Sequence, residues 1–151
     1  MQTQLMKGMA AGMVACTGQA VVGKVEDWAL LPPWEDANIA PRHVERVADS
    51  QGVELGTPSK WLLGTAFHYG YGAFWGAVYA GARERISVSP LTGGLVLGSV
   101  IYAITFPRWG VAVQTGTERP AGVRTKRMTL VAASVAISFG LFTAFLYERM
   151  R

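Results

Sequence analysis

The sequence contains one cysteine, Cys16, and two histidines, His43 and His68, among 151 residues. A single cysteine cannot form an intramolecular disulfide, and no Cys/His spacing typical of a metal site occurs. There is also no Ser-His-Asp or Cys-His arrangement, no phosphate-binding loop, and no basic patch with interleaved aromatic residues. The sequence therefore predicts a protein that is not an enzyme, binds no cofactor or metal, and has no nucleic acid among its partners.

Charged residues are also scarce, at 16% of the chain against about 25% in a typical soluble domain. They are concentrated between long uncharged runs, of which residues 61–82 form one without a single formal charge. About 20 predominantly apolar residues are enough for a helix to cross the ~30 Å hydrocarbon layer of a membrane. We therefore predict an all-α polytopic membrane protein in which residues 1–151 form one membrane domain. Its bundle has four transmembrane helices, with spans at about 6–23, 61–82, 91–108 and 128–147.

The longest polar segment, residues 24–60, is predicted to lie outside the membrane. Leu31-Pro32-Pro33 should end the first helix near Leu30, because proline lacks the backbone donor and disfavours helix in the residue before it. Residues 41–50 fit a short interfacial helix with proline in its first turn and Gly52 at its C-terminal cap. Interfacial tryptophans would hold this region at the headgroup level, namely Trp28, Trp34 and Trp61.

Two of the predicted spans leave alternatives open. A basic residue followed by an apolar run, as at Lys7 and residues 8–22, is also the pattern of a cleaved signal peptide. The third span contains only sixteen uncharged residues, 91–106. It is predicted either to stop there or to continue past Pro107 into residues 111–113, with a kink at the proline and Arg108 extending toward the interface.

Each predicted span carries a pair of small residues four positions apart. At this spacing both members lie on one helix face and allow a second backbone to approach closely. We predict that these pairs are helix-packing sites, either within the bundle or against partner subunits. The residues are Gly8, Gly12, Gly72, Gly76, Gly94, Gly98, Gly140 and Ala144.

His68 lies near the middle of the 61–82 run, and helical spacing puts Tyr71 and Tyr79 on the same broad face. A polar side chain inside a span usually faces the bundle interior and is a candidate functional site. The structural alternative is a neutral imidazole bonded to a tyrosine hydroxyl, Gln19, Ser134 or Ser138. The candidate polar site within the membrane therefore comprises His68, Tyr71, Tyr79, Gln19 and Arg108.

Three short patterns resemble those of the YagU-like bacterial inner-membrane proteins, a family without an assigned biochemical activity. A glycine-rich first span, Gly8-Met-Ala-Ala-Gly-Met-Val, precedes Pro32-Pro33; a second span runs from Phe67-His68 to Val78-Tyr79; and Gly93-Gly94 leads into Phe106-Pro107-Arg108-Trp109-Gly110. The resemblance implies a multi-pass protein of the bacterial inner membrane, with a link to acid tolerance in one member. It implies no catalytic residues.

The sequence supports more than one orientation of the spans in the membrane and more than one function. Nine basic residues flank the spans on the side of the first and third connections, and five flank them on the other side. This count favours a cytoplasmic position for those connections, whereas the resemblance favours cytoplasmic termini.

Functionally, we expect a non-enzymatic structural or accessory subunit, or a homo-oligomer packed through glycine-rich faces. Its partners would be the lipid bilayer, other membrane subunits or further copies of the chain. The alternative is a small transporter or channel with a polar path lined by His68, Tyr71 and Gln19.

Overall fold

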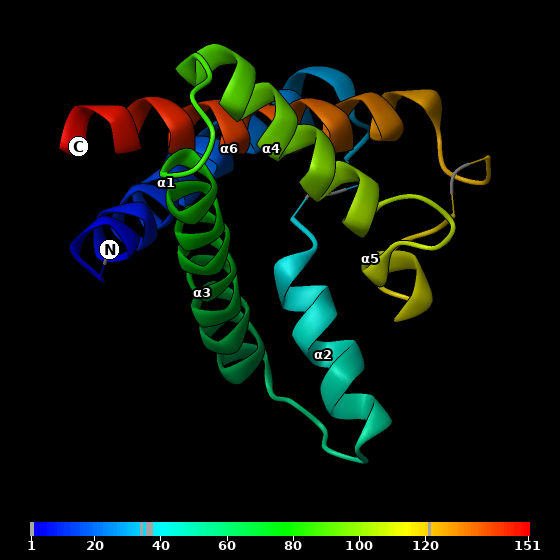
Figure 1. Ribbon diagram of the computed structural model, residues 1–151. Coiled ribbons are helices and arrows are strands. Elements are labelled where there is room, and N and C mark those ends of the chain that lie inside the picture. The colour runs from blue at the N-terminus through cyan, green and yellow to red at the C-terminus, as the bar shows by residue number, and fades with distance from the viewer. Residues whose placement is uncertain (1, 34, 36–37, 121) are drawn as a thin grey trace.

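The computed structural model describes residues 2–33, 35, 38–120 and 122–151, and these residues form helices and connections (Figure 1). The helices are α1 (Gln2–Leu30), α2 (Ala40–Ser50), α3 (Thr57–Arg83), α4 (Pro90–Thr105), α5 (Val111–Gln114) and α6 (Lys126–Met150). No strand occurs within the described ranges. The all-α prediction is therefore confirmed. The predicted anchor Trp34 lies outside the described residues.

The predicted helix boundaries around the first connection are confirmed. Helix α1 ends at Leu30, with one residue between it and the proline pair at 32 and 33, and α2 has its proline in the first turn. Gly52 has a φ of 71°, a left-handed conformation that glycine adopts without a Cβ penalty. The amide of Gly52 donates to the carbonyl of Asp49, and that of Val53 to the carbonyl of Ala48, which completes a helix C-cap.

The third predicted span ends earlier than the 91–108 range. Helix α4 stops at Thr105, and residues 106–110 form a turn rather than a kinked continuation. The short helix α5 follows this turn and runs in a different direction from α4. Gly110 lies so close to the end of α4 that a Cβ there would be 2.8 Å from the amide nitrogen of Phe106. The chain reverses here because proline at 107 cannot continue the helix and glycine at 110 permits the close approach.

The four long helices pack in the spatial order α3, α1, α6, α4. Helix α1 lies between α3 and α6, and α4 packs on the other side of α6. Helices α3 and α4 are joined by residues 84–89 but make few contacts, and they diverge from that connection (Figure 1). Helix α2 lies beside the N-terminal half of α3, on the side where α3 and α4 are farthest apart. The bundle is consequently open between α3 and α4.

Within the described part of the chain, two helices are long and apolar enough to cross a membrane, α1 and α6. Helix α4 is apolar but has only 16 residues, and α3 is long enough but does not reach the same mean hydropathy. The lower hydropathy of α3 comes from its tyrosines, tryptophans, glycines and histidine, which interrupt its aliphatic residues. Two of the four predicted spans are therefore supported by this measure.

The two ends of the bundle carry different groups. The start of α1, the end of α3 and the end of α6 meet at one end, where the Arg83 Nε lies 2.7 Å from a carboxylate oxygen of Glu148. The guanidinium of Arg151 is 3.6 Å from Glu84, and Lys7 donates to the backbone carbonyl of Arg151. The opposite end carries α2, α5 and the two long connections.

Candidate functional site: a cleft between α3 and α4

The glycine pairs form the contacts that hold the long helices together. Gly8 and Gly12 of α1 pack against Gly76 and Gly72 of α3, backbone on backbone; a Cβ at Gly72 would be 2.8 Å from the carbonyl oxygen of Gly12. Such proximity is possible only without side chains at the crossing. The predicted packing residues of α1 and α3 therefore lie in contacts within this chain.

Helices α4 and α6 use the remaining pairs in the same way. A Cβ at Gly94 would be 3.0 Å from the carbonyl oxygen of Gly140, and one at Gly98 would be 2.7 Å from that of Ala136. Ala144 is fully buried in the adjoining hydrophobic cluster. These close contacts hold α1 against α3 and α4 against α6. They leave the space between α3 and α4 unfilled.

This space is a cleft of about 620 Å³, within the range of pockets that hold drug-sized ligands. Its lining is predominantly apolar, and all six helices contribute to it. The floor comes from α1 and α6, through Cys16, Gln19, Ala20, Gly23, Val135, Ala136 and Phe139. The walls come from α3 and α4, including Phe67, His68, Tyr71, Phe74, Trp75, Ile101, Ile104 and Thr105, and α2 and α5 line the wide end.

His68 lies on the α3 wall of this cleft, half-buried against α1. Its Nε2 is 3.4 Å from the backbone carbonyl oxygen of Cys16, and the Cys16 thiol donates to the carbonyl of His68 at 3.3 Å. Because a carbonyl only accepts, Nε2 is the donor in this contact. Two of the expected partners, Ser134 and Ser138, donate instead to carbonyls of their own helix.

Tyr71 reaches across the cleft from α3 to α4. Its hydroxyl oxygen lies 3.2 Å from the hydroxyl oxygen of Thr105. The Tyr71 ring is stacked on Phe67 and meets Trp75 edge-on at 6.1 Å between ring centroids. The cross-cleft hydrogen bond is thus supported by an aromatic row along α3. Sequence spacing indicated this face of α3, but not its partner on α4.

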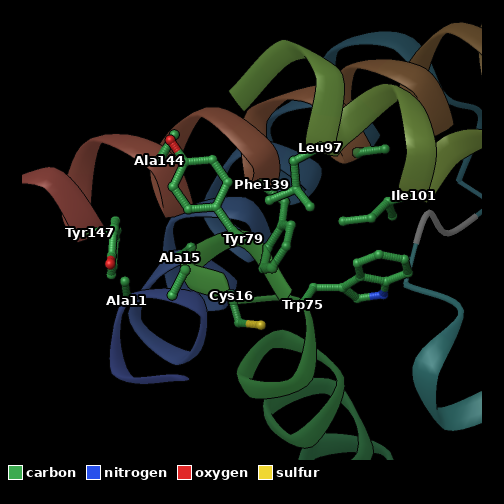
Figure 2. Close-up of a cluster of buried hydrophobic side chains, with 12 residues drawn as sticks. Ala11, Ala15, Cys16, Trp75, Tyr79, Leu97, Ile101, Phe139, Ala144 and Tyr147 are labelled. Carbon is green, nitrogen blue, oxygen red and sulfur yellow. The ribbon is translucent and has the colours of Figure 1, made fainter. Parts of the chain in front are cut away.

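Trp75 is the deepest polar side chain of the α3 wall. It is 8% exposed, and its Nε1 is buried without a hydrogen-bond partner. Figure 2 shows the indole extending away from Tyr79 and Tyr147, toward the side where α2 lies. A buried donor without an acceptor costs about 1–3 kcal/mol, so this group is an unusual feature of the lining.

Two of the five predicted polar residues lie elsewhere. Tyr79 packs edge-on against Tyr147, with ring centroids 5.7 Å apart, in the buried cluster of Figure 2 and not on the cleft. Arg108 is exposed in the turn after α4, and Gln114 donates to its backbone carbonyl at 2.8 Å. The prediction of a common site is wrong for both residues. Gln19, half-buried on α1, does line the cleft with His68 and Tyr71.

Helix α2 covers the wide end of the cleft and is fixed from both sides. His43 Nδ1 is 3.0 Å from the Thr117 hydroxyl oxygen, and Arg42 is 3.6 Å from the Glu118 carboxylate. On the other side, Lys60 at the start of α3 binds Glu45 at 3.0 Å. Burial lowers the pKa of the His43 imidazole below its ordinary value of 6.5. No sequence pattern indicated the contact between His43 and Thr117, which are 74 residues apart.

Comparison with known proteins finds no matching family model, no matching curated protein and no matching solved structure. The cleft is therefore interpreted from its own residues.

Proposed function

We propose that this chain is a non-enzymatic, four-span membrane protein that holds a small, largely apolar molecule in the cleft between α3 and α4. The cleft carries this proposal, because it combines an apolar lining with a few polar groups, as ligand pockets usually do. It lies between two helix pairs that are each fixed by close glycine contacts. A preformed cavity of this kind needs no rearrangement of the bundle to accept a ligand.

The distribution of apolar side chains supports the membrane setting. Large side chains point outward on every long helix, whereas glycine and alanine occupy the helix contacts; Leu62 is 72% exposed, Met6 67% and Leu130 61%. Soluble proteins rarely expose contiguous apolar surface on this scale, while small residues at helix contacts are typical of membrane bundles. We propose that α3 and α4 complete the four spans beside α1 and α6. The YagU-like resemblance supports a bacterial inner membrane.

Native mass spectrometry of the protein purified in mild detergent tests the proposal. The wild type should retain a small molecule, and Ala20→Trp, which fills the cleft from α1, should reduce the retained fraction about tenfold or more. Ala66→Trp is the matched control, because Ala66 is exposed on α3 outside the lining. Equal retention by both variants, or no retained molecule in the wild type, would contradict ligand binding in the cleft.

An accessory or oligomeric subunit is the second candidate function. The outward apolar side chains support it, since they could meet another membrane protein as well as lipid. The glycine pairs do not support it, because they contact one another within the chain. A protein companion that co-migrates in the same purification, with no small molecule retained, would favour this candidate over the first.

Transport would require access to the cleft from both sides of the membrane. A cysteine at position 68 in a Cys16→Ala background reports this access. Reaction with a membrane-impermeant thiol reagent from both faces is the result that transport requires, and reaction from one face or neither indicates binding alone.

A further inference from the structure

We propose that the cleft binds a single-chain amphiphile, with its polar head at the end covered by α2 and its hydrocarbon chain between α3 and α4. This inference rests on the proposed binding function and specifies the class of ligand and its orientation. Fatty acids, monoacylglycerols and lysophospholipids share this chemistry.

The contacts between α1 and α3 define a direction along the cleft. Gly12 packs against Gly72. One turn further along α1, Cys16 bonds to His68, which lies one turn earlier along α3, so the two helices run antiparallel. The C-terminal part of α1 and the N-terminal part of α3 therefore lie toward the same end of the cleft. Helix α2 covers this end, because its first turn lies against Gly64 (Figure 1).

The charged side chains and the exposed polar side chains of the described lining are gathered at this α2 end. They are Lys24, Asp27, Asn38 and Thr65. The Lys24 side chain is 70% exposed, and Asn38 and Thr65 are exposed as well, so this end is open to water. A polar head placed here keeps much of its hydration, which it would lose among apolar side chains.

The opposite end of the cleft is apolar. It is lined by Phe74, Trp75, Ile101 and Phe139, and the last three belong to one buried hydrophobic cluster. Trp75 presents carbon atoms to the cleft, since its Nε1 is covered by protein atoms. Between the two ends, the side chains of His68 and Tyr71 are hydrogen-bonded to groups of α1 and α4. A matching ligand is therefore polar at one end and hydrocarbon along the rest.

The cleft also opens sideways, between α3 and α4. Phe74 of α3 and Ile104 of α4 both line it, and they are 58% and 43% exposed on the outer surface of the bundle. In the proposed membrane setting this opening faces lipid. A hydrocarbon chain can therefore enter from the bilayer without passing the polar end.

The size of the cleft favours one chain over two. The α3 wall from Thr65 to Trp75 extends for about 15 Å at the rise of an α-helix, and the volume of about 620 Å³ is that of a pocket for a drug-sized molecule. One extended alkyl chain with a small head suits these dimensions. A phospholipid would have to leave its second chain outside the cleft.

Native mass spectrometry with compounds of equal chain length tests this inference. The single-chain amphiphiles are lauric acid, monolaurin and lauroyl-lysophosphatidylcholine. The comparisons are dodecane, which has no head, and dilauroyl-phosphatidylcholine, which has two chains. Retention in the cleft is the part that is lost in Ala20→Trp. Wild type should retain at least one amphiphile about threefold or more over both comparisons, as expected for about one net hydrogen bond to the head. The amphiphile with the largest ratio identifies the head.

The double variant Lys24→Leu, Asp27→Leu makes the α2 end apolar, so the preference for the amphiphile over dodecane should fall toward one. Arg46→Leu, Asp49→Leu is the matched control, because this pair has the same charges and spacing, is exposed on α2 and lies outside the lining. It should leave the preference unchanged.

Two results overturn the inference while leaving cleft binding intact. One is a wild-type ratio near one against either comparison compound. The other is an unchanged preference in the variant at positions 24 and 27. If none of the five compounds is retained, both proposals fail.

Photolabelling of the wild type determines the orientation without a variant. A fatty acid with a diazirine at its chain end should label the segments around Phe74 and Phe139. One with the diazirine beside the carboxylate should label the C-terminal part of α1 and the start of α2. Excess lauric acid should remove these labels but not those on outward side chains such as Leu62 and Leu130. The reverse order, or the same labels from both probes, would contradict the proposed orientation.

Discussion

Cys16 and His68 exchange two hydrogen bonds across the contact between α1 and α3. The Cys16 thiol donates to the His68 carbonyl at 3.3 Å, and the His68 imidazole lies 3.4 Å from the Cys16 carbonyl. Since the imidazole and the thiol each bond to the other residue's backbone, the pair fixes the height of α3 along α1. The glycine contacts at Gly12 and Gly72 lie one turn away.

His68→Ala should lower the stability of the bundle by about 1 kcal/mol, the net value of one such hydrogen bond. His68→Gln should recover part of this loss, because its side-chain amide can still donate to the Cys16 carbonyl. Thermal unfolding in detergent measures both variants. A midpoint for His68→Gln that equals or falls below that of His68→Ala would show that packing, rather than the hydrogen bond, fixes this contact.

Gly72→Ala should destabilise the bundle by about 1–3 kcal/mol, the usual cost of overpacking. The added Cβ would overlap the Cys16 sulfur and lie 2.8 Å from the Gly12 carbonyl oxygen, and a backbone atom cannot move aside easily. Gly70→Ala is the matched control on the same helix, because nothing lies within 4 Å of a Cβ there. Unfolding midpoints of the two variants that agree would refute the close α1–α3 contact.

Tyr71→Phe should loosen the cleft by removing the hydrogen bond to Thr105. With a reporter cysteine at position 20 in a Cys16→Ala background, modification by a small maleimide should become about 2–10-fold faster, as expected for one neutral hydrogen bond. Tyr102→Phe is the control, since Tyr102 stacks on Phe106 and lies outside the cleft lining. Equal rates in wild type and Tyr71→Phe would mean that this bond does not restrain α3 relative to α4.

Local chemistry made part of this fold predictable. Proline fixed the end of α1 and the start of α2, and glycine with a left-handed φ ended α2. The four-residue spacing indicated which helix faces would pack. It could not indicate which helix meets which, because Gly72 and Gly94 present the same small surface to any neighbour. Partner choice depends on the whole bundle.

The errors at the site have the same origin. Helical spacing places Tyr79 on the face of His68, but three turns further along α3 the neighbours are Tyr147 and α4 rather than the cleft. The predicted third span includes Arg108 because the uncharged run of residues 91–106 alone is short for a span, whereas α4 ends at Thr105. The cleft itself arises from the divergence of α3 and α4, which no single segment encodes.

Arg83 and Glu148 join the ends of α3 and α6 through a contact of 2.7 Å in which both side chains are less than a quarter exposed. A double-mutant cycle with Arg83→Gln and Glu148→Gln should give a coupling free energy of about 1 kcal/mol, above that of most exposed pairs. The longer pair Lys24 and Asp27, at 3.5 Å and with the lysine side chain 70% exposed, is the comparison and should couple more weakly. Equal coupling in the two cycles would contradict a structural role for the partly buried pair.

The stability of the cover formed by α2 should depend on pH through His43. Burial lowers its pKa below 6.5, so the unfolded state binds more protons than the folded state as pH falls past that value. Stability is therefore complete above about pH 6.5 and decreases below it. The neighbouring Arg42 acts in the same direction by repelling an imidazolium, whereas Glu118, 3.6 Å from Arg42, offsets part of that repulsion.

Unfolding midpoints measured from pH 7.5 to 5 test this dependence. Wild type should lose stability relative to His43→Gln across this range, because glutamine can bond to Thr117 without titrating. The difference between the two proteins isolates His43 from the carboxylates that titrate in both. A constant difference across the range would mean that His43 is protonated equally in the folded and unfolded states, and that α2 is held mainly by the Arg42–Glu118 and Lys60–Glu45 contacts.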